Sequence, residues 1–211
     1  GPTARQRPAE AAPAATATRY DAERGFRYGD MQPLPETRGE LLAVAAALGA
    51  NPQTDLLFGS RATRRAVVEA KLLDRRVVAF ATHGLMPGEL PGISKPALAM
   101  AVTADARESP LLELDDVLGL RLNAQWVLLS ACNTAAGEPG GGAMSGLVRG
   151  FFFAGARSVL ATHWAVDSDS AAALSTATFQ TQAGASVSRS ESLRQAQLAL
   201  IDGKLGDGRW R

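Results

Sequence analysis

Cysteine and histidine are scarce in this sequence, which has one cysteine and two histidines among its 211 residues. A single thiol cannot form an internal disulfide, so the fold does not depend on an oxidising compartment, and zinc sites built from several thiolates are excluded. Strong charge of one sign is missing too, because 22 basic residues balance 21 acidic ones, and this argues against nucleic acid as a direct partner. No apolar run reaches the roughly 20 residues that cross a bilayer, so we expect no membrane partner.

No signal peptide is recognisable at the N-terminus, and we expect a cytoplasmic protein. The hydrophobic fraction of 46% and the charged fraction of 20% are typical of a soluble globular protein. A chain of this length buries roughly 70% of its unfolded surface, which is enough for one α/β domain. Residues 1–35 are rich in Ala, Pro and Arg and lack helical or strand periodicity, which predicts a loop or partly disordered lead-in to a domain over residues 36–211.

Apolar periodicity predicts that strands and helices alternate along the rest of the chain. Thr37 and Glu40 have the spacing of a capping box at the start of the first helix, Gly49 stands where its C-cap belongs, and Ser60 is expected to cap the second helix. The predicted strands are 55–59, 77–81, 96–102, 126–131 and 158–162, and the predicted helices are 35–49, 61–73, 111–120, 143–156, 167–182 and 188–203. Continuous apolar strands in such an alternation predict an α/β fold, with a mostly parallel sheet between two layers of helices.

Three of the predicted strands run into a reactive side chain, namely His83, Cys132 or His163. Ligands gather beyond the carboxyl ends of parallel strands, so these residues meet at one edge if their strands are neighbours. A free cysteine is more often a small buried hydrophobe, and a histidine at a strand end is often structural. Against those readings, Cys132 lies where the chain leaves the core, and His83 precedes Gly84, whose N–H can serve in an oxyanion hole. The 49-residue separation of His83 and Cys132 is close to the roughly 50 residues of caspases.

Three segments, "VVAFATHG", "WVLLSACNT" and "GGGAMSGLVRGFFFAGARSVLATHWAVDSDSAAAL", strongly resemble the CHAT domain family. The resemblance runs from about Leu34 to the end of the chain. It implies a caspase-like fold and a cysteine peptidase related to separase, often fused behind tetratricopeptide repeats. It also implies that His83 is the general base, that Cys132 is the nucleophile, and that the N–H groups of Gly84 and Cys132 form the oxyanion hole, with no metal or organic cofactor. The caspase motif Gln-Ala-Cys is absent, and Ser-Ala-Cys stands in its place.

Four residues after the strand at 158–162 are further candidates: His163, Trp164, Asp167 and Asp169. His163 is a rival general base, although the resemblance favours His83. Trp164 is expected either to form a wall of the substrate cleft or to pack in the core. Carboxylates at a helix N-terminus act as caps, which is one interpretation of Asp167 and Asp169. The resemblance to separase implies instead that an aspartate here lines the pocket for a basic P1 residue, in which case Asp167 pairs with a substrate Arg or Lys.

Two strands that relatives carry are not recognisable, one rich in "GDP" near the beginning and one containing "FW" near the end. We therefore expect a piece of a larger protein, in which upstream repeats or a regulatory partner supply recognition or control, and a sheet that lacks its terminal strands. The resemblance implies an endopeptidase that acts on a protein or peptide substrate. The alternatives are a latent or non-proteolytic interaction module of a multidomain signalling protein, and a small-molecule cysteine hydrolase with the same nucleophile.

Overall fold

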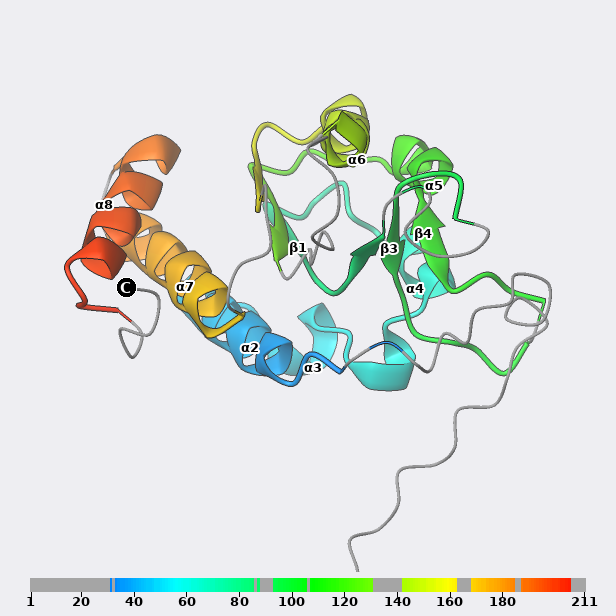
Figure 1. The fold of residues 1–211 in the computed structure, drawn as a ribbon, viewed down its shortest axis with the longest axis horizontal. Helices are drawn as coiled ribbons and strands as arrows, with labels where there is room; N and C mark the ends of the chain where they lie inside the picture. The colour runs from blue at the N-terminus through cyan, green and yellow to red at the C-terminus, as the bar shows by residue number, and fades with distance from the viewer. Residues whose placement is uncertain are drawn as a thin grey trace, which may run out of the picture.

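A parallel sheet of three strands forms the centre of the fold in the computed structural model (Figure 1). The structure describes residues 31, 33–85, 87, 93–105, 107–130, 142–162, 168–184 and 187–205. The strands are β1 (Val77–Ala81), β5 (Trp126–Ser130) and β6 (Val159–Ala161), and they lie in the order β1-β5-β6. Both neighbouring pairs are parallel. These are the three strands that the sequence predicts to run toward the two histidines and the cysteine.

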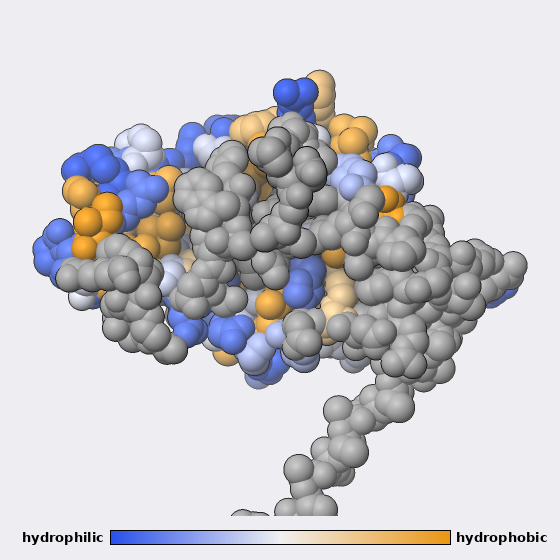
Figure 2. Space-filling model, in the orientation of Figure 1, coloured by the Kyte–Doolittle hydropathy of each residue, from blue (hydrophilic) through white to orange (hydrophobic). Residues whose placement is uncertain are grey.

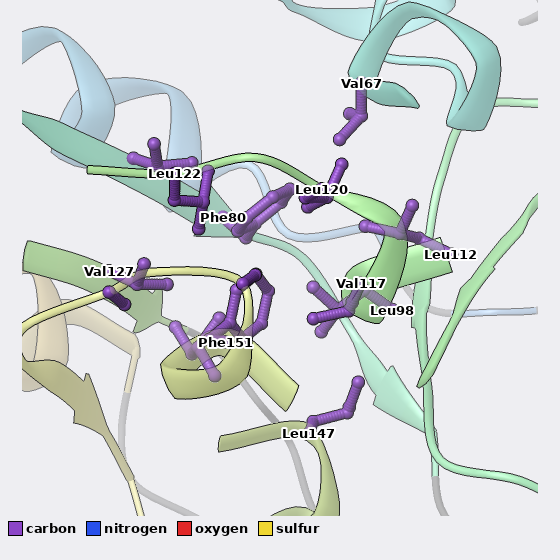
Figure 3. Close-up of a cluster of buried hydrophobic side chains, with 14 of the residues drawn as sticks. Val67, Phe80, Leu98, Leu112, Val117, Leu120, Leu122, Val127, Leu147 and Phe151 are labelled. Carbon is purple, nitrogen blue, oxygen red and sulfur yellow. The ribbon is translucent and has the colours of Figure 1, made fainter. Parts of the chain in front are cut away.

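Helices cover both faces of this sheet. On one face, Phe80 of β1 meets Phe151 of α6 (Gly142–Phe153) with ring centroids 5.6 Å apart, in a cluster that also includes α5 (Leu114–Gly119) (Figure 3). On the other face, Trp126 and Leu128 of β5 pack against α2 (Glu36–Leu48) and α7 (Ser168–Gly184). Every residue of β5 is buried, which is why the strand is apolar without alternation up to its last residue, Ser130. The predicted three-layer α/β sandwich is confirmed.

A second, smaller sheet lies beside the parallel one and shares its core cluster (Figure 1). It is antiparallel, in the order β2-β3-β4, and its strands are β2 (Gly84–Leu85), β3 (Ala97–Ala99) and β4 (Leu111–Glu113). The strand predicted over 96–102 is therefore shorter and belongs to this sheet. The helix predicted over 111–120 begins only after β4, as α5. Glu113 is the N-cap of α5 and forms a capping box with Asp116, so the chain changes from strand to helix at this residue.

Helix α2 begins without the predicted capping box. Its N-cap is Pro35, and the Thr37 hydroxyl donates to the carbonyl of Leu34 at 2.7 Å. The Glu40 carboxylate is buried and accepts hydrogen bonds inside the fold rather than at the helix start. The prediction is wrong because Glu40 shares a helix face with core residues one turn and two turns further on, so its side chain points inward. The helix does end at Gly49, which has a φ of 67° in the left-handed region.

Two further predictions are wrong between α2 and β1. Residues 55–59 do not form a strand, because α3 (Pro52–Asp55) ends at their first residue and the 3-10 helix η2 (Gly59–Arg61) begins at their last. Within the described residues no strand pairs with this segment, and an apolar run without a partner strand cannot satisfy its backbone as a sheet. The second helix is shorter than predicted, α4 (Arg64–Val68). Its cap is Thr63, whose hydroxyl accepts the N–H of Ala66 at 3.1 Å, whereas Ser60 lies within η2.

The chain turns from α6 into β6 through Gly155. The Gly155 N–H donates to the carbonyl of Phe152 at 3.1 Å, and the Ala156 N–H donates to the carbonyl of Phe151 at 2.9 Å, the paired bonds of a Schellman motif. Gly155 has a φ of 111°, and a Cβ at this position would stand 2.1 Å from the carbonyl oxygen of Leu122. Only glycine fits here, so this residue determines where the chain enters β6.

Helix α8 (Arg189–Ile201) packs against α7 at the end of the described chain (Figure 1). The Ser188 hydroxyl caps α8 by accepting the N–H of Glu191 at 3.2 Å. Hydrophobic areas lie among hydrophilic ones over α7 and α8 in the same view (Figure 2). Among the helices that the structure describes, none combines the length and the apolar character needed to span a membrane.

A bidentate ion pair joins α4 to α5. Arg64 donates from Nε to one oxygen of Asp116 at 2.9 Å and from Nη2 to the other oxygen at 2.5 Å. The same carboxylate accepts the N–H of Glu113 at 3.0 Å. Partial burial by itself raises the pKa of Asp116, but the hydrogen bonds from Arg64 and Glu113 outweigh burial and hold this pKa below its usual value. The ionised form of Asp116 is therefore the one that connects the two helices.

Candidate active site

The carboxyl ends of β1 and β5 lie side by side at one edge of the parallel sheet. The residue numbers of every pair along these strands differ by 49, up to Ala81 opposite Ser130. Just beyond the last pair, the Thr82 N–H donates to the carbonyl of Ser130 at 3.3 Å. The register therefore equals the separation of His83 and Cys132, each of which follows its strand by two residues.

Strand β5 lies between β1 and β6, so the strand that leads toward Cys132 is flanked by the two strands that lead toward histidines. The described strands thus end at a common edge, as the sequence predicts. This topology does not distinguish His83 from His163 as the partner of the cysteine, because both strands are direct neighbours of β5. Cys132 and His163, together with Trp164 and Asp167, lie outside the described residues.

His83 is held at this edge by the small antiparallel sheet. The Thr82 hydroxyl donates to the carbonyl of Ala99 at 2.6 Å, and the Ala99 N–H donates to the carbonyl of His83 at 2.9 Å. The His83 side chain is half-buried. Because Thr82 also donates its N–H to β5, residues 82 and 83 form the point where the chain passes from one sheet to the other. The backbone of His83 is therefore fixed by β3 rather than by a loop.

Gly84 begins β2 and lies opposite Leu98 of β3. The bond from the Ala99 N–H to the His83 carbonyl flanks this pair, so Gly84 and Leu98 form a non-hydrogen-bonded pair of the antiparallel ladder. In a pair of this kind, the N–H of each residue points away from the partner strand. The N–H of Gly84 is therefore directed away from β3.

A cavity of about 930 Å³ runs along β1 on the side of the strand that does not face β5. Its lining comes from β1 itself and from α2, α3, η2 and α4, and it extends along the chain to His83. The volume falls within the range of about 300–1,000 Å³ that is usual for ligand pockets. The cavity reaches the candidate active site only at its His83 end, since the rest of it follows the length of β1.

A buried carboxylate lies behind this edge, and the sequence prediction missed it. Glu40 on α2 is only 4% exposed, and each oxygen of its carboxylate accepts a hydrogen bond from one serine hydroxyl. Ser130 of β5 donates at 2.8 Å and Ser175 of α7 donates at 2.5 Å. Glu40 precedes Val44 by four residues, so an acidic residue on the apolar face of a predicted helix was the signal that could have identified it.

Asp169 is the one predicted substrate-binding residue that the structure describes. It lies exposed in the first turn of α7, where a carboxylate interacts favourably with the helix dipole. Among the described residues, no group of three or more His, Cys, Asp or Glu side chains is arranged to hold a metal ion.

Comparison with known families decides the assignment. A family model of the CHAT domain matches residues 2–207. The chain belongs to the CHAT domain family. This family is caspase-like and related to peptidases, in agreement with the parallel sheet between layers of helices. No curated protein matches the chain. The boundary of the CHAT domain at residue 36 stays a prediction.

Proposed function

We propose that this CHAT domain is a cysteine endopeptidase in which Cys132 is the nucleophile and His83 is the general base. The observation that carries the proposal is the register of β1 and β5, because it equals the His83–Cys132 separation. Neighbouring strands are about 4.8 Å apart, and two residues extend a strand by only about 7 Å. His83 and Cys132 each follow their paired strands by two residues, so we expect their backbone positions to lie close to one another.

In the proposed reaction, the His83 imidazole takes the proton of the Cys132 thiol, and the thiolate attacks the carbonyl carbon of the scissile peptide bond. The C–N bond then breaks, the leaving amine receives the proton from His83, and a thioester to Cys132 remains. A water molecule gives a proton to the same imidazole and hydrolyses the thioester, which releases the acid and restores the thiol. No step of this sequence requires a metal ion or an organic cofactor.

The oxyanion of the tetrahedral intermediate is stabilised in this proposal by the N–H groups of Gly84 and Cys132. The pairing of Gly84 with Leu98 supports that role, because it directs the Gly84 N–H away from β3 and leaves it available on the other side of β2. The loss of one oxyanion-hole donor typically costs about 3–4 kcal/mol of transition-state stabilisation.

We infer that the substrate is a protein or peptide with a basic P1 residue. Asp167 then receives the P1 guanidinium or ammonium group, and Trp164 and Asp169 contribute to the same pocket. Upstream tetratricopeptide repeats or a regulatory partner supply substrate recognition or control in the whole protein.

The test is a fluorogenic peptide library varied at P1, applied to the protein and to Cys132→Ala, His83→Ala and His163→Ala variants. We expect Cys132→Ala to abolish cleavage, and His83→Ala to lower kcat/KM by about 10²–10⁴-fold, as is usual for a lost general base. His163→Ala is the matched control, because it removes the histidine that follows the other neighbour of β5, and under this proposal it should cleave at a rate close to that of the unmodified protein.

Two results would contradict the proposal. A large loss in His163→Ala with full activity in His83→Ala would transfer the general base to the other histidine. Failure of the whole library, with a Cys132 thiol no more reactive to iodoacetamide than a free thiol, would exclude the peptidase. For the P1 pocket, Asp167→Asn should abolish the preference for Arg and Lys, whereas Asp169→Asn should only weaken it, and an unchanged preference in Asp167→Asn would refute that assignment.

A further inference from the structure

The buried Glu40 carboxylate is poorly explained as a contribution to stability. Glu40, Ser130 and Ser175 are exposed by 4%, 3% and 3%, so the whole hydrogen-bonded group is inside the protein. Among the described residues, no Lys or Arg forms a salt bridge with Glu40. Burying a carboxylate without a cation is costly even when hydroxyl groups donate to it, and replacing a whole buried polar group by apolar side chains is often neutral or stabilising.

The place of the group in the fold suggests another role. The group joins the end of β5 to two helices. Ser130 is the last residue of β5, Glu40 belongs to α2, and Ser175 belongs to α7. Figure 1 shows α2 and α7 lying side by side, which is the arrangement that brings both helices to the same strand end.

Ser130 makes contacts in two directions. Its hydroxyl donates to Glu40 at 2.8 Å, and its carbonyl accepts the N–H of Thr82 at 3.3 Å. Thr82 directly precedes His83, and Ser130 precedes Cys132 by two residues. One serine therefore connects the carboxylate to both strands of the candidate active site.

We propose that Glu40 is a positioning residue of this active site. By accepting the Ser130 hydroxyl, it fixes the orientation of the last residue of β5, which precedes Cys132 by two residues. The Ser175 hydroxyl on the second oxygen holds the carboxylate in the plane that this requires. This inference rests on the proposed function, because it concerns the alignment of the same nucleophile and base.

Substitution at Glu40 separates alignment from stability. Glu40→Leu fills the site with apolar atoms but removes both acceptors, which leaves the buried Ser130 hydroxyl without a partner. We therefore expect a folded protein with a lower unfolding midpoint, and its activity is measured well below that midpoint. A misalignment of about 1 Å at a catalytic group reduces the rate by as much as about 10²-fold, so kcat should fall by about 10–100-fold with little change in KM. Glu40→Gln should restore kcat, because its amide oxygen accepts one serine hydroxyl and its amide N–H donates to the other.

A pair of single-hydroxyl deletions provides the matched control. Ser130→Ala removes the link to β5 and should reproduce the loss of kcat seen in Glu40→Leu. Thr178→Val also removes a buried hydroxyl, but that hydroxyl donates only to the Leu174 carbonyl of its own helix at 2.8 Å, so its kcat should stay near that of the unmodified protein. If Glu40→Leu fails to fold, this pair decides: equal kcat in both variants overturns the proposal, and a loss confined to Ser130→Ala supports it.

The single cysteine of the chain gives a second readout that does not depend on proteolysis. The rate of iodoacetamide alkylation, followed by mass against pH, reports on Cys132 alone. We expect Glu40→Leu and Ser130→Ala to change this pH profile and Glu40→Gln to restore it. An inactive unmodified protein whose profile still shifts in these variants would refute the peptidase but support the positioning role. Full kcat and an unchanged profile in a folded Glu40→Leu would overturn the positioning role while leaving the peptidase intact.

Discussion

Alanine substitutions at three glycines should give three different changes in the unfolding free energy. Gly39 lies inside α2, and no atom lies within 4 Å of the place that a Cβ would take, so Gly39→Ala removes only the flexibility of glycine and should stabilise the protein by about 0.5–1 kcal/mol. Gly49 also has open space around it, but its φ is 67°, so Gly49→Ala introduces backbone strain alone. A left-handed conformation costs a non-glycine residue about 1–2 kcal/mol.

Gly155→Ala adds a steric collision to this strain. The new Cβ would stand 2.1 Å from the carbonyl oxygen of Leu122, so the backbone must shift. Two hydrogen bonds hold that backbone in place: the Leu122 N–H donates to Ala154 at 2.8 Å, and the Arg157 N–H donates to Ala124 at 2.8 Å. If both weaken by about 1 kcal/mol each, the total destabilisation, with strain included, is about 3–4 kcal/mol.

Urea denaturation followed by tryptophan fluorescence and by circular dichroism measures all three variants against the unmodified protein. From the highest to the lowest urea concentration at the midpoint, the expected order is Gly39→Ala, the unmodified protein, Gly49→Ala and Gly155→Ala. The slope with denaturant should stay constant, which shows that stability and not the compactness of the unfolded chain has changed. A Gly155→Ala protein as stable as Gly49→Ala would show that the turn into β6 adjusts freely, and the collision argument would be wrong.

Two further predictions concern the ion pair between α4 and α5 and the aromatic contact beneath the parallel sheet. Because the pKa of Asp116 is lowered in the folded protein, its contribution to stability is present above the unfolded pKa and is lost as the pH falls through the folded pKa. Asp116→Asn should therefore lower the unfolding free energy at neutral pH by about 1–3 kcal/mol, and in acid the gap should shrink, whereas a gap independent of pH would contradict the argument. Phe151→Ala removes a fully buried ring from its contact with Phe80 and should cost about 3–5 kcal/mol in thermal unfolding. Phe153→Ala, on the same helix but 83% exposed, should change stability by less than about 0.5 kcal/mol, and equal losses in both variants would refute the assignment of the core face.

The central sheet could be predicted because its strands are covered on both faces. The runs that become β1 and β5 are apolar except for Ser130 at the end of β5, and strands covered by helices on both faces require such runs. The sequence does not reveal the direction of a strand, however. All three residues of β3 are buried, so its apolar run resembles that of a parallel strand, and only the pairing with β2 and β4 makes it antiparallel. The strand prediction over 55–59 was wrong for the same reason, since strand formation depends on a partner that lies elsewhere in the chain.

The candidate site was predictable where it depends on strand ends and not where it depends on contacts between distant elements. His83 and Gly84 could be identified because they follow a recognisable strand. The hydrogen bonds that tie Thr82 and His83 to Ala99 join residues that no local pattern relates. Glu40 was assigned to a helix cap, because a Thr followed three residues later by Glu matches that motif. Its actual partners, Ser130 and Ser175, are 90 and 135 residues away in the chain.

The pairing of β1 with β5 also bears on how the protein folds. The small sheet joins residues 12 to 16 positions apart, whereas β1 and β5 join residues 49 positions apart, and β5 and β6 join residues 32 apart. Closing a flexible loop of 49 residues costs about 3 kcal/mol of free energy through lost chain entropy, and parallel pairings between distant segments form slowly. We therefore expect the antiparallel sheet to form early and the edge that leads to His83 and Cys132 to be completed late. A partly folded chain would then contain both residues without yet having an active site.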